Sequence, residues 1–235
     1  MTEDIPRPFW DHIEELRFRV LRCLAATAIG TVIGFWMVTP VLRVLAKPVG
    51  HFVFLQPTEA FFVRLKIALG IGIVLAVPWI LHQIWQFAAV AIPLEERKII
   101  RLILPVSYLL FLAGFLFGFF FLVPAGIKFL LSYSSPELVA MLSIESYVSF
   151  VNAMCLTLGA VAQMPLVSLF LGRFGILDWQ FLSDKRRTAI LIIYIASALL
   201  TPGPDPVTAI LLAIPTYILF ECSIWTCRWA QRKTT

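Results

Sequence analysis

Two short stretches of the chain place carboxylates beside cationic side chains. The first, HIEELRFR, carries Glu15 close to Arg17 and Arg19, and the second, LEERK, carries Glu96 between another acid and a basic pair. Carboxylates accept the planar, paired hydrogen bonds that a guanidinium group donates. Two such stretches on one side of a membrane would form a receptor for a basic ligand.

A simpler explanation is that these charges pair within their own helix. Glu15 and Arg19 are four residues apart and Glu14 and Arg17 are three apart, and such a pair is worth about 0.2–0.5 kcal/mol. The arginines also fit the enrichment of basic residues on the cytoplasmic side of membrane proteins, but acidic residues contribute little to that bias. Both explanations stay open for the acidic residues at this point.

The sequence lacks the motifs that mark common catalytic and cofactor sites. It has no phosphate-binding G-x-x-x-x-G-K loop, no G-x-S-x-G, no H-E-x-x-H and no C-x-x-C. Its three histidines, His12, His51 and His82, have no ligand-like spacing. We therefore predict no enzymatic activity, no cofactor and no metal site.

The composition is that of an integral membrane protein. Of the 235 residues, 60% are hydrophobic and only 14% are charged, whereas soluble domains carry about 25% charged residues. The net charge of +5 comes from basic residues scattered near the ends of apolar runs, so no nucleic-acid partner is predicted. The acidic N-terminus and the long first apolar run do not fit a cleaved signal peptide.

Six apolar runs predict an all-α, polytopic fold with six transmembrane helices in one domain, residues 1–235. The runs cover about 20–38, 60–89, 99–131, 147–171, 188–200 and 207–225. Internal prolines predict tilts or kinks: Pro78, Pro105, Pro124, Pro165 and Pro215. The fifth run stops at TPGPDP, which contains Asp205. We expect the last two helices to form a hairpin too short to cross the bilayer fully.

Basic residues predict the orientation of the six helices. Most of the 19 lysines and arginines fall before the first run, between the second and third, between the fourth and fifth, and after the sixth. The positive-inside rule therefore predicts that both termini are cytoplasmic. Residues 1–19 would be a cytoplasmic segment and residues 227–235 a cytoplasmic tail.

Two further features concern the packing of these helices. The pairs Gly30/Gly34 and Gly114/Gly118 could allow close helix–helix contact. Gln163, an amide inside the fourth run, should avoid lipid and face the protein interior or a wet cavity. It would either satisfy carbonyls freed by Pro165 or mark a polar site that touches another protein's span.

The chain also resembles a known family along nearly its whole length. The segments that carry the resemblance are HIEELRFR, KPV, PTEAFF, VPWILHQIWQF, EERK, SYVSFV and LLTPGPDPVTAILLAIP, followed by FE. They are similar to the TatC family, the six-span core of the twin-arginine protein translocase. The resemblance implies a receptor for twin-arginine signal peptides in the cytoplasmic (inner) membrane. It also implies single-span TatA-like and TatB-like partners, self-association in a larger complex, and transport of folded proteins driven by the proton-motive force.

The resemblance also implies roles for individual residues. Signal-peptide-binding positions of the family match Glu15, Arg17 and Glu96, with Arg17 orienting its acidic neighbours. Positions linked to function or to partner contact match Pro48, Phe87, Gln163 and Asp205. Many family members have glutamate where this chain has Gln163, so a protonatable role does not carry over at that position.

The residues alone offer less support to two other classes of function. A secondary transporter of a small solute or ion would use Gln163, Asp205 and the broken helices as a site near the midplane. No pair of matching halves supports that alternative. An intramembrane enzyme lacks a candidate nucleophile or metal pair.

Overall fold

The computed structural model describes residues 9–46, 56–89, 98–133, 143–201 and 206–232, and these residues are all-α. The predicted positions Pro48, Glu96 and Asp205 lie outside the described residues. The helices are α1 Phe9–Ala46, α2 Glu59–Ala88, α3 Lys98–Phe117, α4 Val123–Leu131, α5 Ile144–Val161, α6 Met164–Arg173, α7 Trp179–Asp184, α8 Arg186–Leu200 and α9 Pro206–Arg232. A π-helical turn, Gly118–Leu122, joins α3 to α4.

The predicted six-helix arrangement is confirmed. The segment from α3 to α4 is one continuous helical run, and α5 and α6 make a second run with a break. Within the described residues, five runs are long and apolar enough to cross a membrane: Ile13–Ala46, Glu59–Ala88, Arg101–Leu131, Ile144–Arg173 and Pro206–Arg232. The sixth, α8, has 15 residues, or about 22 Å at 1.5 Å per residue.

The expectation of two short final helices holds for α8 and is wrong for α9. The last helix has 27 residues and ends at Arg232, well beyond the predicted end near residue 225. Its polar last turns continue the helix past the apolar run, because helical hydrogen bonding does not require apolar side chains. Most of the predicted tail 227–235 is therefore helical.

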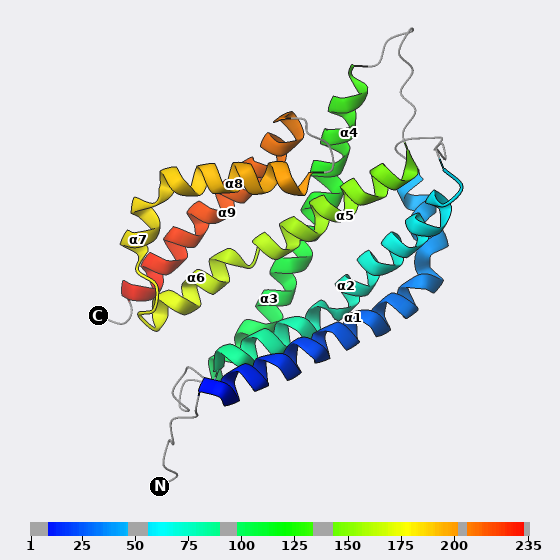
Figure 1. Cartoon of the computed structure of the whole chain (residues 1–235). Helices are drawn as coiled ribbons and strands as arrows, with labels where there is room; N and C mark the ends of the chain where they lie inside the picture. Colours follow the sequence, from blue (N-terminus) through cyan, green and yellow to red (C-terminus); the bar gives the residue numbers. More distant parts are fainter. Residues whose placement is uncertain (1–8, 47–55, 90–97, 134–142, 202–205, 233–235) are drawn as a thin grey trace.

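The first helix is also longer than the apolar run that predicted it. It begins at Phe9 and contains Pro40 without interruption. Part of the predicted N-terminal segment 1–19 is therefore the first turns of α1. In Figure 1, α1 begins and α2, α6 and α9 end on the same lower-left side of the molecule, which is the side that most basic residues mark.

Two of the predicted prolines coincide with irregular helix geometry. A break separates α5 from α6 just before Pro165, and the π-helical turn ends at Leu122, two residues before Pro124, with the Val123 N–H donating to the Gly118 carbonyl. Proline has no N–H to give and its ring clashes with the preceding turn. The helices continue through Pro78, Pro105 and Pro215.

The predicted glycine contacts are present between neighbouring helices. A Cβ atom added to Gly30 would lie 2.6 Å from the Gly72 carbonyl oxygen, and one on Gly34 would lie 2.6 Å from the Ala68 carbonyl oxygen. A Cβ on Gly114 would meet the Leu158 carbonyl oxygen at 2.5 Å. These approaches let α1 pack on α2 and α3 pack on α5 backbone to backbone.

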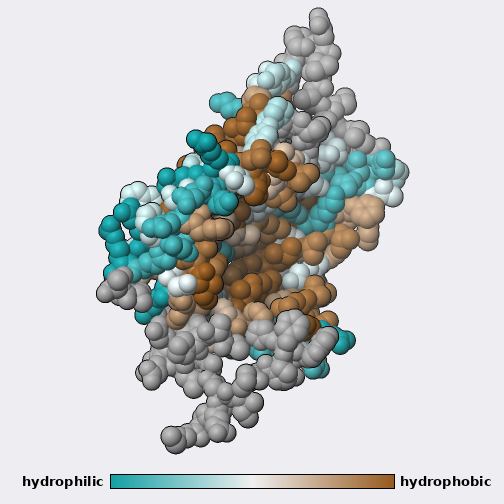
Figure 2. Space-filling model, turned by 60° about the vertical axis from the view of Figure 1, so that its left-hand side comes forward, coloured by the Kyte–Doolittle hydropathy of each residue, from teal (hydrophilic) through white to brown (hydrophobic). Residues whose placement is uncertain are grey.

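The core centres on α5, which lies between the α1–α2 pair and the α8–α9 pair (Figure 1). Met154 and Leu158 of α5 are fully buried, and they pack with Leu122 and Leu212 from other helices. Figure 2 shows hydrophobic side chains across the middle of one face and hydrophilic ones to the left and right of them. That pattern suits a molecule that exposes apolar surface to lipid and polar surface at its ends.

Candidate functional site

Glu15 forms an ion pair with Arg19 on the same face of α1. The Arg19 Nη2 and Nε atoms donate to Glu15 Oε1 at 2.5 Å and 3.1 Å. The side chains are only 14% exposed for Arg19 and 23% exposed for Glu15. The pairing four residues apart that the sequence suggested is therefore formed, and it is shielded from water on one side.

Arg19 also joins α1 to α2. Its Nη1 atom donates to the Gln83 carbonyl oxygen at 3.3 Å, to Gln83 Oε1 at 3.4 Å and to Gln86 Oε1 at 3.4 Å. Gln83 is buried, with 4% of its surface exposed. Because one guanidinium holds the carboxylate and the second helix together, the position of Glu15 is set by the α1–α2 contact.

Arg17, predicted to orient its acidic neighbours, lies elsewhere on the helix. Two residues turn an α-helix through about 200°, so Arg17 points away from Glu15, and it is exposed. Within the described residues, Glu14 and Arg17 form no ion pair with each other. The arginine that contacts Glu15 is Arg19, and the orienting role of Arg17 stays a prediction.

Sequence reasoning missed the supporting glutamines. Gln83 and Gln86 stand three residues apart in the mostly apolar segment WILHQIWQF, which places them on one face of α2. Uncharged polar residues inside a span are costly against lipid, so such a pair is itself a signal of an interior contact. The sequence does not show which residue the two glutamines contact, because Arg19 is 64 residues away from Gln83.

An apolar groove continues from this ion pair along the α1–α2 seam. Its volume is about 410 Å³. The residues that line it from α1 are Leu16, Arg19, Val20 and Leu24. From α2 it is lined by Ile80, Ile84 and Phe87. The predicted residue Phe87 therefore lines the same groove as Arg19, which pairs with the predicted residue Glu15.

Gln163 lies at the break between α5 and α6 and bonds to α3. The Ser107 hydroxyl donates to Gln163 Oε1 at 2.5 Å, and Gln163 Nε2 donates to the Ser107 carbonyl oxygen at 3.0 Å. The Trp85 indole N–H donates to the Ser107 hydroxyl at 3.1 Å. The carbonyl that Gln163 satisfies therefore belongs to another helix, not to the turn that Pro165 disrupts.

The other side of Gln163 faces a hollow beside the last helices. This cavity of about 270 Å³ is lined by Gln163, Met164 and Val167, and across it by Leu177, Leu182 and Phe220. Gln163 is half-buried, so its amide is shared between the interior of the bundle and this hollow. The expectation that it avoids lipid agrees with these contacts.

Comparisons with known proteins match the chain to one family over nearly its full length. A family model described as "Sec-independent protein translocase protein (TatC)" matches residues 11–215. The protein of that name from Carboxydothermus hydrogenoformans is 37% identical over 98% of this chain and 97% of its own length. Its counterpart from Desulforapulum autotrophicum is 35% identical over 98% and 88%. This chain belongs to the TatC family.

A solved structure agrees with that assignment. The crystal structure of "Twin Arginine Translocase Receptor- TatC" superposes with a TM-score of 0.86 at 34% identity, covering 93% of this chain and 99% of the other.

The α8 helix of this TatC-family chain is tied to α9 by a feature that the sequence analysis did not predict. Arg186 Nε and Nη2 contact Glu221 Oε1 and Oε2 at 2.9 Å and 3.0 Å, and the Tyr217 hydroxyl donates to Glu221 Oε1 at 2.8 Å.

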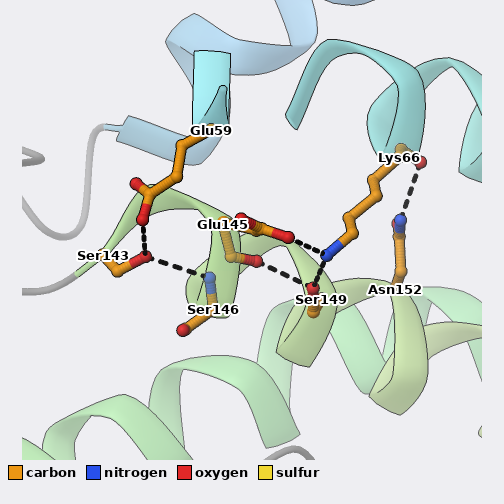
Figure 3. Close-up of polar contacts among 7 residues, drawn as sticks. All are labelled: Glu59, Lys66, Ser143, Glu145, Ser146, Ser149 and Asn152. Carbon is orange, nitrogen blue, oxygen red and sulfur yellow. Dashed lines mark hydrogen bonds and ion pairs between the residues drawn. The ribbon is translucent and has the colours of Figure 1, made fainter. Parts of the chain in front are cut away.

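A second polar network of this TatC-family chain lies at the opposite end of α2, where it meets the start of α5 (Figure 3). Lys66 Nζ contacts Glu145 Oε1 at 2.7 Å and donates to Ser149 Oγ at 2.9 Å, and Asn152 Nδ2 donates to the Lys66 carbonyl at 2.8 Å. The Ser143 hydroxyl donates to the buried Glu59 carboxylate at 3.5 Å. In the described part of the chain, no cluster of three or more His, Cys, Asp or Glu side chains is arranged to hold a metal ion.

Proposed function

We propose that this chain is the signal-peptide receptor and core subunit of a twin-arginine translocase in the cytoplasmic membrane. It recognises twin-arginine signal peptides and enables transport of folded proteins driven by the proton-motive force. Membership of the TatC family supports this function. The observation that carries it is the Glu15 carboxylate, held by Arg19 at the start of an apolar groove.

The chemistry of this site matches the chemistry of a signal peptide. Such peptides place a positively charged region before an apolar region, and the site places a carboxylate before an apolar groove. A carboxylate has about four lone-pair positions, so Glu15 can accept from an incoming guanidinium as well as from Arg19. Because Arg19 is anchored on α2, the carboxylate loses little side-chain freedom when the peptide binds, which lowers the entropic cost of binding.

A second carboxylate makes the site selective for two arginines. One exposed ion pair is worth at most about 1 kcal/mol, so a single acid would discriminate poorly. Glu96 is proposed as the second acid, on the basis of its EERK segment and the family resemblance. Guanidinium groups bind carboxylates through two parallel hydrogen bonds that an ammonium group cannot make. The pair of acids should therefore prefer Arg-Arg to Lys-Lys.

The remaining proposals concern topology and partners. Both termini lie in the cytoplasm, on the side that the basic residues mark. The hollow beside Gln163 contacts the span of a TatA-like or TatB-like protein, and Asp205 and Pro48 contribute to contacts within the assembled complex. The chain self-associates in that complex and acts as a receptor, not as an enzyme.

The test is peptide binding to the purified full-length protein in detergent. A fluorescent twin-arginine signal peptide should bind wild type, and Glu15→Gln should weaken it roughly tenfold, which corresponds to about 1.4 kcal/mol. Glu14→Gln is the matched control, because Glu14 is an exposed neighbour on the same helix. Equal affinities of the two variants, or equal binding of Arg-Arg and Lys-Lys peptides to wild type, would refute the receptor function.

A further inference from the structure

A polar hollow lies between α7 and the last turns of α9, and neither Glu15 nor Arg17 lines it. Its volume is about 550 Å³. Trp179 and Asp178 line it from one side, and Arg228, Gln231 and Arg232 line it from α9. Among the described residues, no position carried over from the family lines this hollow.

Two guanidinium groups point at this one hollow. Arg228 and Arg232 are four residues apart and therefore lie on one face of α9. The Arg228 guanidinium lies 4.9 Å from the centroid of the Trp179 ring, a cation–π contact that holds the charge in place. Asp178 is the acid that lines the hollow, and its Oδ1 accepts from the Gln180 N–H at 3.2 Å. The hollow thus carries two cations and one carboxylate that caps a helix.

The walls of the hollow are tied together by hydrogen bonds. Gln231 Nε2 donates to the Leu177 carbonyl oxygen at 2.9 Å, which fixes the segment before α7 against α9. Gly175 begins this segment with a φ of +68°, a conformation that few residues other than glycine adopt. The hollow is therefore built by the fold and does not depend only on mobile surface side chains.

Exposed tryptophans place the hollow at the depth of lipid headgroups. Trp225 is 68% exposed and Trp229 is 55% exposed, one turn apart on the same stretch of α9 as Arg228. Tryptophans in membrane proteins gather at the membrane–water boundary, where an amphipathic ring is stable. Since α9 is long enough to span the membrane and this is its polar end, the two arginines lie at that boundary.

We propose that this hollow binds the phosphodiester headgroup of an anionic phospholipid. Guanidinium groups donate paired hydrogen bonds to phosphate oxygens, and basic pockets between helices on the cytoplasmic side bind anionic headgroups. The cation at Arg228 is positioned before the lipid arrives. The acyl chains would extend along the exposed apolar surface of α9, including Ile218 and Trp225.

Native mass spectrometry of the full-length protein in detergent tests this site. Wild type should retain phosphatidylglycerol more strongly than phosphatidylcholine. Replacing both arginines, Arg228→Gln with Arg232→Gln, should weaken phosphatidylglycerol binding roughly ten- to thirtyfold. The control removes the same charge from exposed arginines outside the hollow, Arg101→Gln with Arg187→Gln, and should bind as wild type does. Equal losses in the two double variants would overturn the proposal.

Two further measurements distinguish a built lipid site from a site for soluble anions and from attraction by charge alone. Arg228→Lys with Arg232→Lys keeps the charge and the fold but removes the paired hydrogen bonds, so its affinity should fall between wild type and the glutamine variant. Inorganic phosphate and glycerophosphoglycerol, the headgroup without acyl chains, should not displace the lipid at millimolar concentration. Displacement by either of them would show a site for soluble anions, and unchanged affinity in the lysine variant would show that charge alone attracts the lipid. Either result would overturn the assignment of a built lipid site.

Discussion

Ser107 of α3 and Gln163, at the break between α5 and α6, exchange two hydrogen bonds, one through each polar group of the glutamine amide. Ser107 is fully buried, so its hydroxyl and its carbonyl have little access to water. Hydrogen bonds between helices in membranes average about 0.6 kcal/mol, and leaving a buried polar group unsatisfied costs about 1–3 kcal/mol. The amide at position 163 therefore stabilises the place where the fourth span breaks.

Gln163→Leu should destabilise the protein, and the loss should be coupled to Ser107. We expect the free energy of unfolding, measured by SDS titration in mixed micelles, to fall by about 1–3 kcal/mol. In a double-mutant cycle with Ser107→Ala, the coupling energy should be about 1 kcal/mol. Additive effects of the two substitutions would show that the two side chains do not act together. We also expect Gln163→Leu to weaken export and crosslinking to a single-span protein while signal-peptide binding persists.

Gln163→Glu should be tolerated, but only with its carboxyl group protonated. The amide nitrogen of Gln163 donates to a carbonyl oxygen, and an ionised carboxylate has no proton to donate. Infrared spectroscopy should therefore detect a protonated carboxyl band in this variant that is missing in Gln163→Leu. Full export activity with an ionised carboxylate at this position would contradict the expectation.

Arg19→Gln should weaken signal-peptide binding more than Arg17→Gln does. Arg19 holds Glu15 and also reaches Gln83 and Gln86 on α2, whereas Arg17 is exposed on another face of α1. Without Arg19 the Glu15 side chain must be ordered when the peptide binds, at a cost of about 0.5–1.5 kcal/mol, or roughly two- to tenfold in affinity. Fluorescence anisotropy with a labelled peptide measures the difference. The same loss in both variants would mean that only net charge matters.

Gly30→Leu should separate α1 from α2. A Cβ atom at this position would lie 2.6 Å from the Gly72 carbonyl oxygen, so the helix backbones must move apart at a cost of about 1–3 kcal/mol or more. Ala28→Leu is the control, because Ala28 is exposed on the same helix. We expect the midpoint of thermal unfolding in detergent to fall for Gly30→Leu alone. A similar midpoint for the two variants would contradict the close contact.

The short α8 helix should leave its end accessible to water-soluble reagents. Ser197 and Thr201 are buried in the protein, with 3% and 6% exposed, whereas Leu199 is 82% exposed. A cysteine that replaces Leu199 should react with a membrane-impermeant maleimide, and a cysteine that replaces Val32, exposed midway along α1, should not. Protection of both positions would show that lipid covers the end of α8.

The apolar runs were sufficient to predict which segments cross the membrane, but not where each helix ends. An apolar run in the sequence marks only the apolar part of a helix. The helix itself can continue through polar turns, such as those after Trp225 in α9. Prolines were a weak guide as well. Of the five predicted sites, only Pro124 and Pro165 lie next to a π-helical turn or a helix break, and the helices continue through the other three.

For the site, sequence spacing predicted contacts within a helix and missed contacts between helices. The Glu15–Arg19 pair follows from a separation of four residues. The contacts of Arg19 with Gln83 and of Gln163 with Ser107 join residues 64 and 56 positions apart, and they depend on how the bundle closes. The supporting role predicted for Arg17 came from the family resemblance, and sequence spacing alone did not show that Arg19 also reaches α2.

The hydrogen bonds that run from Trp85 through Ser107 to Gln163 have only one direction. The indole nitrogen is a donor and never an acceptor, so the Ser107 hydroxyl must receive at one side and give its single hydrogen to Gln163 Oε1 at the other. A proton wire needs every member to accept on one side and donate on the other. This row of groups therefore cannot conduct protons from Gln163 to α2, and it binds α2 and α3 to the break between α5 and α6.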